Sequence, residues 1–243
     1  MISHYTLRCR LKKWVLKGST SFEASRLHPQ RVLLQRANAR SIDYIEAHML
    51  STAIGFATEK DLLSYCLDAA PAQGAYLEFG VYKGGSLRFM AQTKPHIRFH
   101  GFDSFEGLPE PWTGYCLGKG AFSLRGHLPK MPGNVTLHKG WFDQVLPDWR
   151  THHPENIAFL HVDCDIYAST VTVLHQLADR LQPDSILLFD EYLGYPNWEN
   201  HEFKAWQEFV ARYRVQYEYI AFGREQVAVR ITAIGGDKGA AGQ

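Results

Sequence analysis

The sequence has little that would place the protein in a membrane, an oxidising compartment or a zinc-binding class. No uninterrupted apolar run in its 243 residues approaches the roughly 18 residues that span a membrane. The four cysteines are scattered without C-x-x-C spacing: Cys9, Cys66, Cys116 and Cys164. The chain does not start with an apolar segment and a small-residue cleavage site. We therefore expect no secretory signal, reduced thiols and a cytoplasmic protein.

Net charge is also nearly absent. Lys+Arg 26 balance Asp+Glu 25 to leave +1, so bulk charge gives no reason to expect a nucleic-acid partner. Hydrophobic residues make up 45% of the chain, which excludes overall disorder. The length fits one domain with a sizeable core.

The charge is unevenly distributed along the chain. Residues 1–40 carry nine Lys or Arg and a single acid, Glu23, a charge of +8 that leaves −7 for the remainder. Four apolar residues in this stretch recur at helical spacing: Leu7, Leu11, Trp14 and Val15. We expect residues 1–50 to form a basic helical arm that packs against a second subunit of a homo-oligomer. A membrane-surface helix, an organelle transit peptide and simple solvated charge remain alternatives.

Residues 51–234 alternate between helical and strand patterns. Short apolar runs predict buried parallel strands at 75–80, 96–103, 135–141, 156–163 and 184–191. Helices are predicted after Thr58, after Gly85, and over 169–181 and 201–213, and the last run of the domain predicts a hairpin. This pattern indicates an α/β fold with a mostly parallel sheet covered by helices. We expect 235–243, GGDKGAAGQ, to be a disordered tail.

Acidic residues close the central strands. They are Glu78, Asp103, Asp163, Asp165, Asp190 and Glu191. Because the carboxyl ends of parallel strands meet at one edge of a sheet, these acids would repel one another there. A single acid is explained well enough as a helix or loop cap. The whole set favours a bound divalent metal, a cationic cofactor, or both.

The turn after the first strand has a glycine pattern of its own, E-x-G-x-x-x-G-x-S over 78–86. It is not G-x-G-x-x-G, which counts against a dinucleotide pyrophosphate site. Asp103 ends the next strand 25 residues after Glu78, where an acid can accept both hydroxyls of a ribose. Together these features indicate a nucleoside-containing cofactor without a pyrophosphate. S-adenosylmethionine fits, because its sulfonium charge suits the acidic rim.

Four stretches occur in order: YLEFGVYKGGS, GFDSFEGLPE, HVDCDIYAST and LLFDEY. They resemble the class I S-adenosylmethionine-dependent methyltransferases of the macrocin O-methyltransferase (TylF-like) family, over about residues 51–200. The segment 51–55 is similar to the family's T-M-I-G element, with Ala in place of Met. The resemblance implies a Rossmann-like class I methyltransferase fold, with a mostly parallel seven-stranded sheet, helices on both faces and a C-terminal β-hairpin.

The same resemblance implies roles for individual residues. Asp163, Asp190 and Glu191 would bind Mg²⁺, and the family has Asp where this chain has Glu191. Asp165 would be the general base, so that Asp163 and Asp165 form the catalytic pair. Mg²⁺ on two neighbouring substrate oxygens would lower the pKa of the hydroxyl, and a nearby carboxylate could then take its proton. The predicted cofactor-binding residues are Thr52, Ile54, Glu78, Gly80, Val81, Tyr82, Gly84, Ser86, Asp103, Ser104, Phe105, Gly140, Trp141 and Asp163.

The predicted function is metal-dependent methylation of a hydroxyl on a sugar or another small molecule with vicinal oxygens. A D-x-D motif also occurs in nucleotide-sugar glycosyltransferases, but that interpretation leaves Glu78 and Asp103 without a role. A haloacid-type phosphatase needs D-x-D-x-[TV] near the chain start, and Tyr167 occupies the last position here. A non-catalytic binding protein on a methyltransferase scaffold is a further alternative.

Two other features receive weaker predictions. Four histidines are interpreted as structural rather than as bases: His138, His152, His153 and His161. The long connection over 106–134 contains Trp112 and Tyr115, and loops of this length often act as lids or binding elements.

Overall fold

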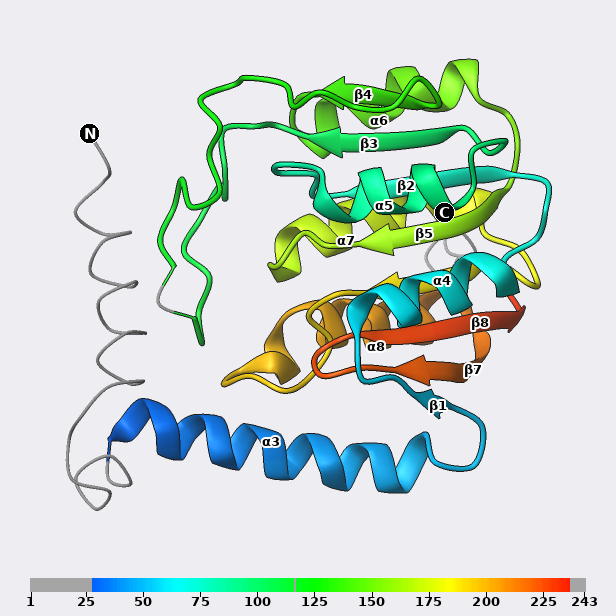
Figure 1. The fold of residues 1–243 in the computed structure, drawn as a ribbon. Helices are drawn as coiled ribbons and strands as arrows, with labels where there is room; N and C mark the ends of the chain where they lie inside the picture. Colours follow the sequence, from blue (N-terminus) through cyan, green and yellow to red (C-terminus); the bar gives the residue numbers. More distant parts are fainter. Residues whose placement is uncertain (1–27, 116, 237–243) are drawn as a thin grey trace, which may run out of the picture.

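The computed structural model describes residues 28–115 and 117–236. Its eight strands form one sheet in the order β1-β7-β8-β6-β5-β2-β3-β4 (Figure 1). They are β1 Ile54–Gly55, β2 Ala75–Phe79, β3 Phe99–Asp103, β4 Val135–Lys139, β5 Ile157–Val162, β6 Ile186–Phe189, β7 Gln216–Phe222 and β8 Val227–Ala233. Strand β8 runs antiparallel to β6 and β7, and the other pairs are parallel. The predicted sheet and hairpin are confirmed, and the two-residue β1 is one strand more than expected.

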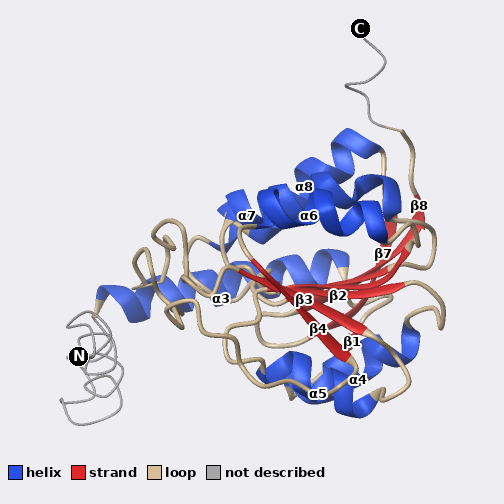
Figure 2. Ribbon diagram, turned by 90° about the horizontal axis from the view of Figure 1, so that it is seen from above, coloured by secondary structure: helices blue, strands red, loops and turns tan. Residues whose placement is uncertain are grey.

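Helices cover both faces of the sheet. They are α3 Pro29–His48, α4 Glu59–Ala69, α5 Gly85–Thr93, α6 Phe142–His152, α7 Tyr167–Leu177 and α8 Glu202–Tyr213, with 3₁₀ turns at Ala178–Arg180 and Trp198–Asn200. Helices α6, α7 and α8 lie on one face, and α4 and α5 lie on the other (Figure 2). Helix α3 runs along the edge of the sheet formed by β1 and β7 (Figure 1). None of the described helices has the length and apolar character to cross a membrane.

The central strands are buried because helices cover both faces of the sheet. Every residue of β2 and β5 is buried, as continuous apolar runs in a parallel sheet require. The predicted cap of α4 is present, since the Thr58 side chain accepts a hydrogen bond from the Asp61 amide at 3.2 Å. Helix α6 was not expected from the sequence. It contains Pro147, and proline is normally unfavourable inside a helix. The buried side chains of Leu146 and Trp149 anchor the helix.

Helix α3 packs against its own chain. The Gly194 amide donates to the Ser41 hydroxyl at 2.9 Å, and the Tyr44 and Tyr219 hydroxyls lie 2.7 Å apart. This part of the predicted arm therefore has an intramolecular contact that the sequence did not indicate. The amphipathic segment around Trp14 and the chain beyond 236 lie outside the described residues. The division into arm, domain and tail stays a prediction.

The topology brings the carboxyl ends of β2, β3, β5 and β6 to one edge of the sheet. The connection between β3 and β4 lies beyond that edge, on the left of Figure 1. Gly80, just after β2, approaches the next turn so closely that a Cβ there would lie 1.6 Å from the Asp163 carbonyl oxygen, and its φ is +96°. A residue with a side chain could not occupy this position without moving the turn after β5.

Candidate active site

A cavity of about 440 Å³ opens at the carboxyl edge of the sheet. Residues that follow β2, β3, β4, β5 and β6 all contribute to its wall. Eight of the predicted catalytic, cofactor-binding and metal-binding residues line it: Gly80, Tyr82, Asp103, Ser104, Trp141, Asp163, Asp165 and Glu191. The strand-end acids therefore do gather around one space, as parallel strands require.

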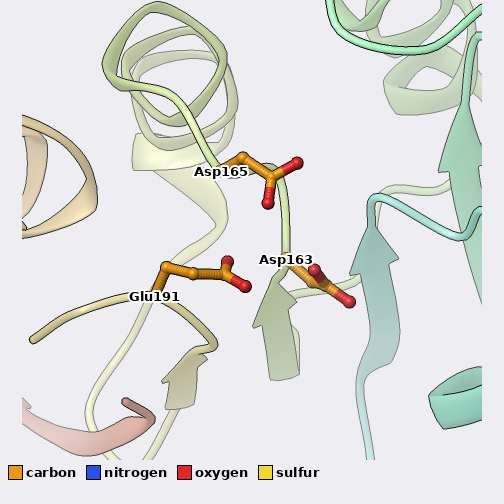
Figure 3. A group of neighbouring side chains, drawn as sticks. All are labelled: Asp163, Asp165 and Glu191. Atoms are coloured by element: carbon orange, nitrogen blue, oxygen red, sulfur yellow. The ribbon is translucent and has the colours of Figure 1, made fainter. Parts of the chain in front are cut away.

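Three carboxylates converge on this cavity. One oxygen from each of Asp163, Asp165 and Glu191 lies within 4.8 Å of the others. Asp163 and Asp165 come from the turn between β5 and α7, and Glu191 follows β6 (Figure 3). Burial raises the pKa of all three carboxyls well above their usual values, and the negative charge of Asp190 raises each further. The cluster contains only like charges and would be stabilised by a proton or a cation.

The backbone at Asp165 has an unusual conformation. Its φ is +68°, a left-handed value that costs a non-glycine residue on the order of 1–3 kcal/mol. The Ile166 amide donates to the Cys164 carbonyl at 2.7 Å across this residue. The tight turn separates Asp163 from Asp165 and lets both side chains reach the same cavity.

The observed cluster differs from the predicted metal-binding set at one position. The group contains Asp165, whereas the predicted metal-binding set contains Asp190. Asp190 Oδ1 instead lies 3.6 Å from His161 Nε2. Burial would raise the pKa of Asp190, but the neighbouring His161 lowers it below its usual value. Asp190 therefore lies beside His161 and is not among the three acids whose oxygens lie within 4.8 Å of one another.

His161 lies between two acids beneath the cavity. It is fully buried, and its Nδ1 lies 2.9 Å from Glu78 Oε2, also fully buried. Burial alone would lower the pKa of His161, but Asp190 and Glu78 together raise it well above its usual value. Burial raises the pKa of Glu78, and His161 and Ser86 oppose that rise. Glu78 and Ser86 do not line the cavity. His161 was assigned only a structural role from the sequence, and its position two residues before Asp163 was the available signal.

The Asp103 carboxylate hydrogen-bonds to two turns, the one after β2 and the one after its own strand, β3. Its Oδ2 accepts the amides of Val81 at 2.9 Å and Tyr82 at 2.7 Å, and its Oδ1 accepts the Phe105 amide at 2.6 Å. These bonds hold the glycine turn after β2 against the end of β3. The carboxylate lines the cavity, at the position where the sequence predicted a ribose partner.

Several predicted cofactor residues lie elsewhere. Phe105 has a φ of +58° and is completely buried in the hydrophobic core, so it does not face the cavity. Thr52 and Ile54 are exposed, the latter on the edge strand β1. Val81, Gly84 and Gly140 shape the turns without lining the cavity: a Cβ on Gly84 would meet Met131, and the Gly140 amide donates to the Asp103 carbonyl at 3.0 Å.

Other cavity residues were missed or only partly indicated by the sequence. Trp112 and Phe122 reach the cavity from the β3–β4 connection, and Phe142 and Asp143 reach it from the start of α6. Trp112 had been noted as part of a binding loop. Phe142 and Asp143 directly follow Trp141, so the end of β4 was the signal for them. Phe122 has no local signal.

The comparisons with known proteins agree with this geometry. Residues 77–192 match the family described as a methyltransferase domain. Over 160 residues the chain is 30% identical to the 8-demethyl-8-(2,3-dimethoxy-alpha-L-rhamnosyl)-tetracenomycin-C 4'-O-methyltransferase of Streptomyces olivaceus. Both comparisons therefore place the similarity of this chain with methyltransferases. The match covers 54% of this chain, and the chain spans 59% of the length of that curated relative.

Two solved structures share the fold of this methyltransferase domain. Calicheamicin methyltransferase CalS11 superposes with a TM-score of 0.55 at 20% identity, covering 93% of this chain and 91% of its own. The O-methyltransferase NovP gives a TM-score of 0.54 at 22% identity, covering 71% and 79%. The Rossmann-like fold class predicted from the sequence motifs, and the resemblance to class I methyltransferases, are confirmed.

Proposed function

We propose that the methyltransferase domain transfers the methyl group of S-adenosylmethionine to a hydroxyl of a sugar or another small molecule with neighbouring oxygens, with the help of Mg²⁺. The observation that carries this proposal is the convergence of Asp163, Asp165 and Glu191 on one cavity that Asp103 also lines. The S. olivaceus relative is named for methylating a rhamnosyl group, which supports a sugar acceptor.

The charge of the cavity suits a cationic methyl donor. Its wall contains five acids, and no Lys or Arg is present among the described residues that line it. The acids are Asp103, Asp143, Asp163, Asp165 and Glu191. Negative charge in a partly enclosed cavity attracts a sulfonium and a divalent cation. Asp103 would bind the ribose, and Tyr82 and Trp141 would border the nucleoside.

The donor set fits a divalent cation with a preference for oxygen ligands. Among the described residues, Glu191 Oε2 is buried without a hydrogen-bond partner, so it is free to act as a ligand. Hard carboxylate oxygens suit Mg²⁺. We propose Asp163 and Glu191 as ligands, because both belong to the predicted and to the observed group, and the role predicted for Asp190 stays a prediction. A bound divalent cation would lower the pKa of an acceptor hydroxyl.

Asp165 would act on the acceptor proton. Its raised pKa favours proton acceptance near neutral pH, where a general base is most effective. The acceptor oxygen then forms a bond to the methyl carbon while the carbon–sulfur bond breaks, and the donor leaves as S-adenosylhomocysteine. The turns that hold Asp103 and Asp165 would fix the two reactants in line, which accounts for much of the rate gain in such reactions.

The test begins by finding the acceptor. Mass spectrometry of cell-extract compounds that gain a labelled methyl group from S-adenosylmethionine would identify it. With that acceptor, Asp165→Asn should lower the methylation rate by about 10²–10⁴-fold, the usual contribution of a general base, and Asp163→Ala should abolish turnover. Both variants should still bind S-adenosylhomocysteine, and Asp148→Asn, an exposed acid on α6, should keep full activity.

Two results would refute the proposal. Full activity of the wild type in excess chelator would show that the reaction does not need the proposed metal ion. Thermal stabilisation by a UDP-sugar, without any by S-adenosylhomocysteine, would instead favour a glycosyltransferase.

The homo-oligomer and the cytoplasmic location expected from the sequence are also proposals. Helix α3 exposes Leu33, Leu34 and Ile42, which is consistent with a subunit contact. The light-scattering mass of the full chain and of an Ile42→Lys variant would test the oligomer.

A further inference from the structure

Glu202 is a buried acid outside the cavity wall. It is the first residue of α8 and is completely buried, whereas acids are rarely buried unless they are paired. Its Oε2 accepts the backbone amide of Glu191 at 3.0 Å. The backbone amide of Cys164 also lowers the pKa of this carboxyl, which burial raises. One side chain therefore bonds to the turn at Glu191 and faces the turn at Cys164, 27 residues apart in the sequence.

These two turns supply the whole carboxylate cluster. Cys164 lies between Asp163 and Asp165, and the other amide belongs to Glu191 itself. Backbone amides fix the path of the chain, so bonds to them fix where the three side chains begin. Backbone pairing between the two segments ends where the Asp190 amide donates to the Val162 carbonyl at 2.9 Å. The Glu202 carboxylate takes over where the strand pairing stops.

A packing role alone does not account for an acid at this position. A carboxylate removed from water loses free energy unless its oxygens are bonded, and Glu202 Oε1 has no partner among the described residues. An apolar side chain would fill the same space at lower cost. Its place in the first turn of α8 offers some compensation from the helix dipole, but an acid there can equally well face solvent. What the buried carboxylate provides is an acceptor for the Glu191 amide next to the turn at Cys164.

We propose that Glu202 is a positioning residue that holds the turn after β5 and the turn after β6 at the separation at which Asp163, Asp165 and Glu191 share one cation. This role rests on the proposed function. Outer groups that orient metal ligands typically contribute 10–100-fold to metal affinity. Glu202 itself does not line the cavity and touches neither donor nor acceptor.

The experiment measures Mn²⁺ binding to the full chain by electron paramagnetic resonance, next to S-adenosylhomocysteine binding by calorimetry. Glu202→Ala should weaken Mn²⁺ binding by about 10–100-fold and leave S-adenosylhomocysteine binding within about twofold. Glu202→Gln keeps an oxygen that can accept the Glu191 amide and should retain Mn²⁺ affinity within about threefold. Glu208→Gln changes an exposed acid on the same helix and should behave as the wild type.

Three results separate the possibilities. Undiminished Mn²⁺ binding by Glu202→Ala, with the wild type binding normally, would overturn the role of Glu202 alone. A parallel loss of Mn²⁺ binding, S-adenosylhomocysteine binding and stability in both Ala and Gln variants would show a general structural role instead. Absence of Mn²⁺ binding by the wild type would overturn the proposed cation site, and this role with it.

A further variant covers the case in which Glu202→Ala does not fold. Glu202→Asp keeps the charge but withdraws the carboxylate by one methylene. Its Mn²⁺ affinity should fall between those of the Gln variant and the 10–100-fold loss, and an affinity equal to that of the wild type would overturn the role.

Discussion

Two groups of buried ionisable side chains lie at the same edge of the sheet and are neutralised in different ways. In the first, His161 lies 2.9 Å from Glu78 and 3.6 Å from Asp190, so opposite charges are in contact. In the second, Asp163, Asp165 and Glu191 bring only acids within 4.8 Å. The first group contains its own counter-charge. The second depends on protons or on a cation that none of the described residues lining the cavity provides.

The difference follows from where each group lies on the strands. Glu78 and His161 are direct register partners on β2 and β5, so they meet inside the sheet, where an unpaired charge would be costly. Asp163, Asp165 and Glu191 come just after the strands end and line the cavity. A ligand can reach the second group but not the first. The first group therefore lies inside the fold, and the second lies at the wall of the cavity.

Removing the counter-charge of the first group should have the largest effect. His161→Leu leaves Glu78 buried without its partner, and breaking a buried pair in this way typically costs about 3–5 kcal/mol. We expect a loss of this size in the free energy of unfolding, measured by urea titration with chelator present. The variant would make the first group as purely acidic as the second.

The matched controls separate charge from packing. His152→Gln alters an exposed histidine on α6 and should leave the unfolding free energy unchanged. The double variant Glu78→Leu with His161→Leu removes both charges and should recover part of the loss. A loss below about 1 kcal/mol in the single variant, the size expected of an exposed pair, would contradict the comparison.

This contrast also shows what the sequence could and could not reveal. Apolar runs that end in acids predicted the parallel strands, and parallel strands bring their ends together, so the meeting of Asp163, Asp165 and Glu191 was predictable. The partner of Asp190 was not, because it depends on the lateral register of β5 against β6, which no local pattern encodes. The burial of Phe105 in the core was not predictable either, because no local pattern encodes its positive φ.

Supplying the counter-charge of the second group should have an intermediate effect. Mg²⁺ at 100 times its dissociation constant should add about 2.7 kcal/mol to the free energy of unfolding, by mass action. Glu191→Gln should lose most of this increment because a ligand oxygen is replaced. In chelator the same variant should be more stable than the wild type, because burial and like charges raise the pKa of Glu191. Urea titrations with Mg²⁺ and with chelator give both quantities.

Asp148→Asn serves as the control for Mg²⁺. It removes an exposed acid on α6 and should change neither the stability in chelator nor the Mg²⁺ increment. An equal increment in wild type and Glu191→Gln would show that Mg²⁺ binds elsewhere, and the second group would then no longer be distinguished from the first by its need for a cation.

The smallest effect is expected for a third set of ionisable groups, a pair of histidines that avoid like-charge repulsion by remaining neutral. His100 Nδ1 and His138 Nε2 lie 3.0 Å apart on β3 and β4. Burial and the neighbouring histidines, including His153, lower the pKa of both to about 4. The unfolded chain takes up protons near pH 6.5 and the folded protein only near pH 4, so this pair should lower the free energy of unfolding as the pH falls through that window.

His138→Gln should reduce the slope of the unfolding free energy against pH in that window by at most one proton, about 1.4 kcal/mol per pH unit. It should leave the stability above pH 7 unchanged. Urea titrations from pH 7.5 to 5 in saturating Mg²⁺ would measure it, and identical slopes in variant and wild type would show that these histidines are not kept neutral by the fold.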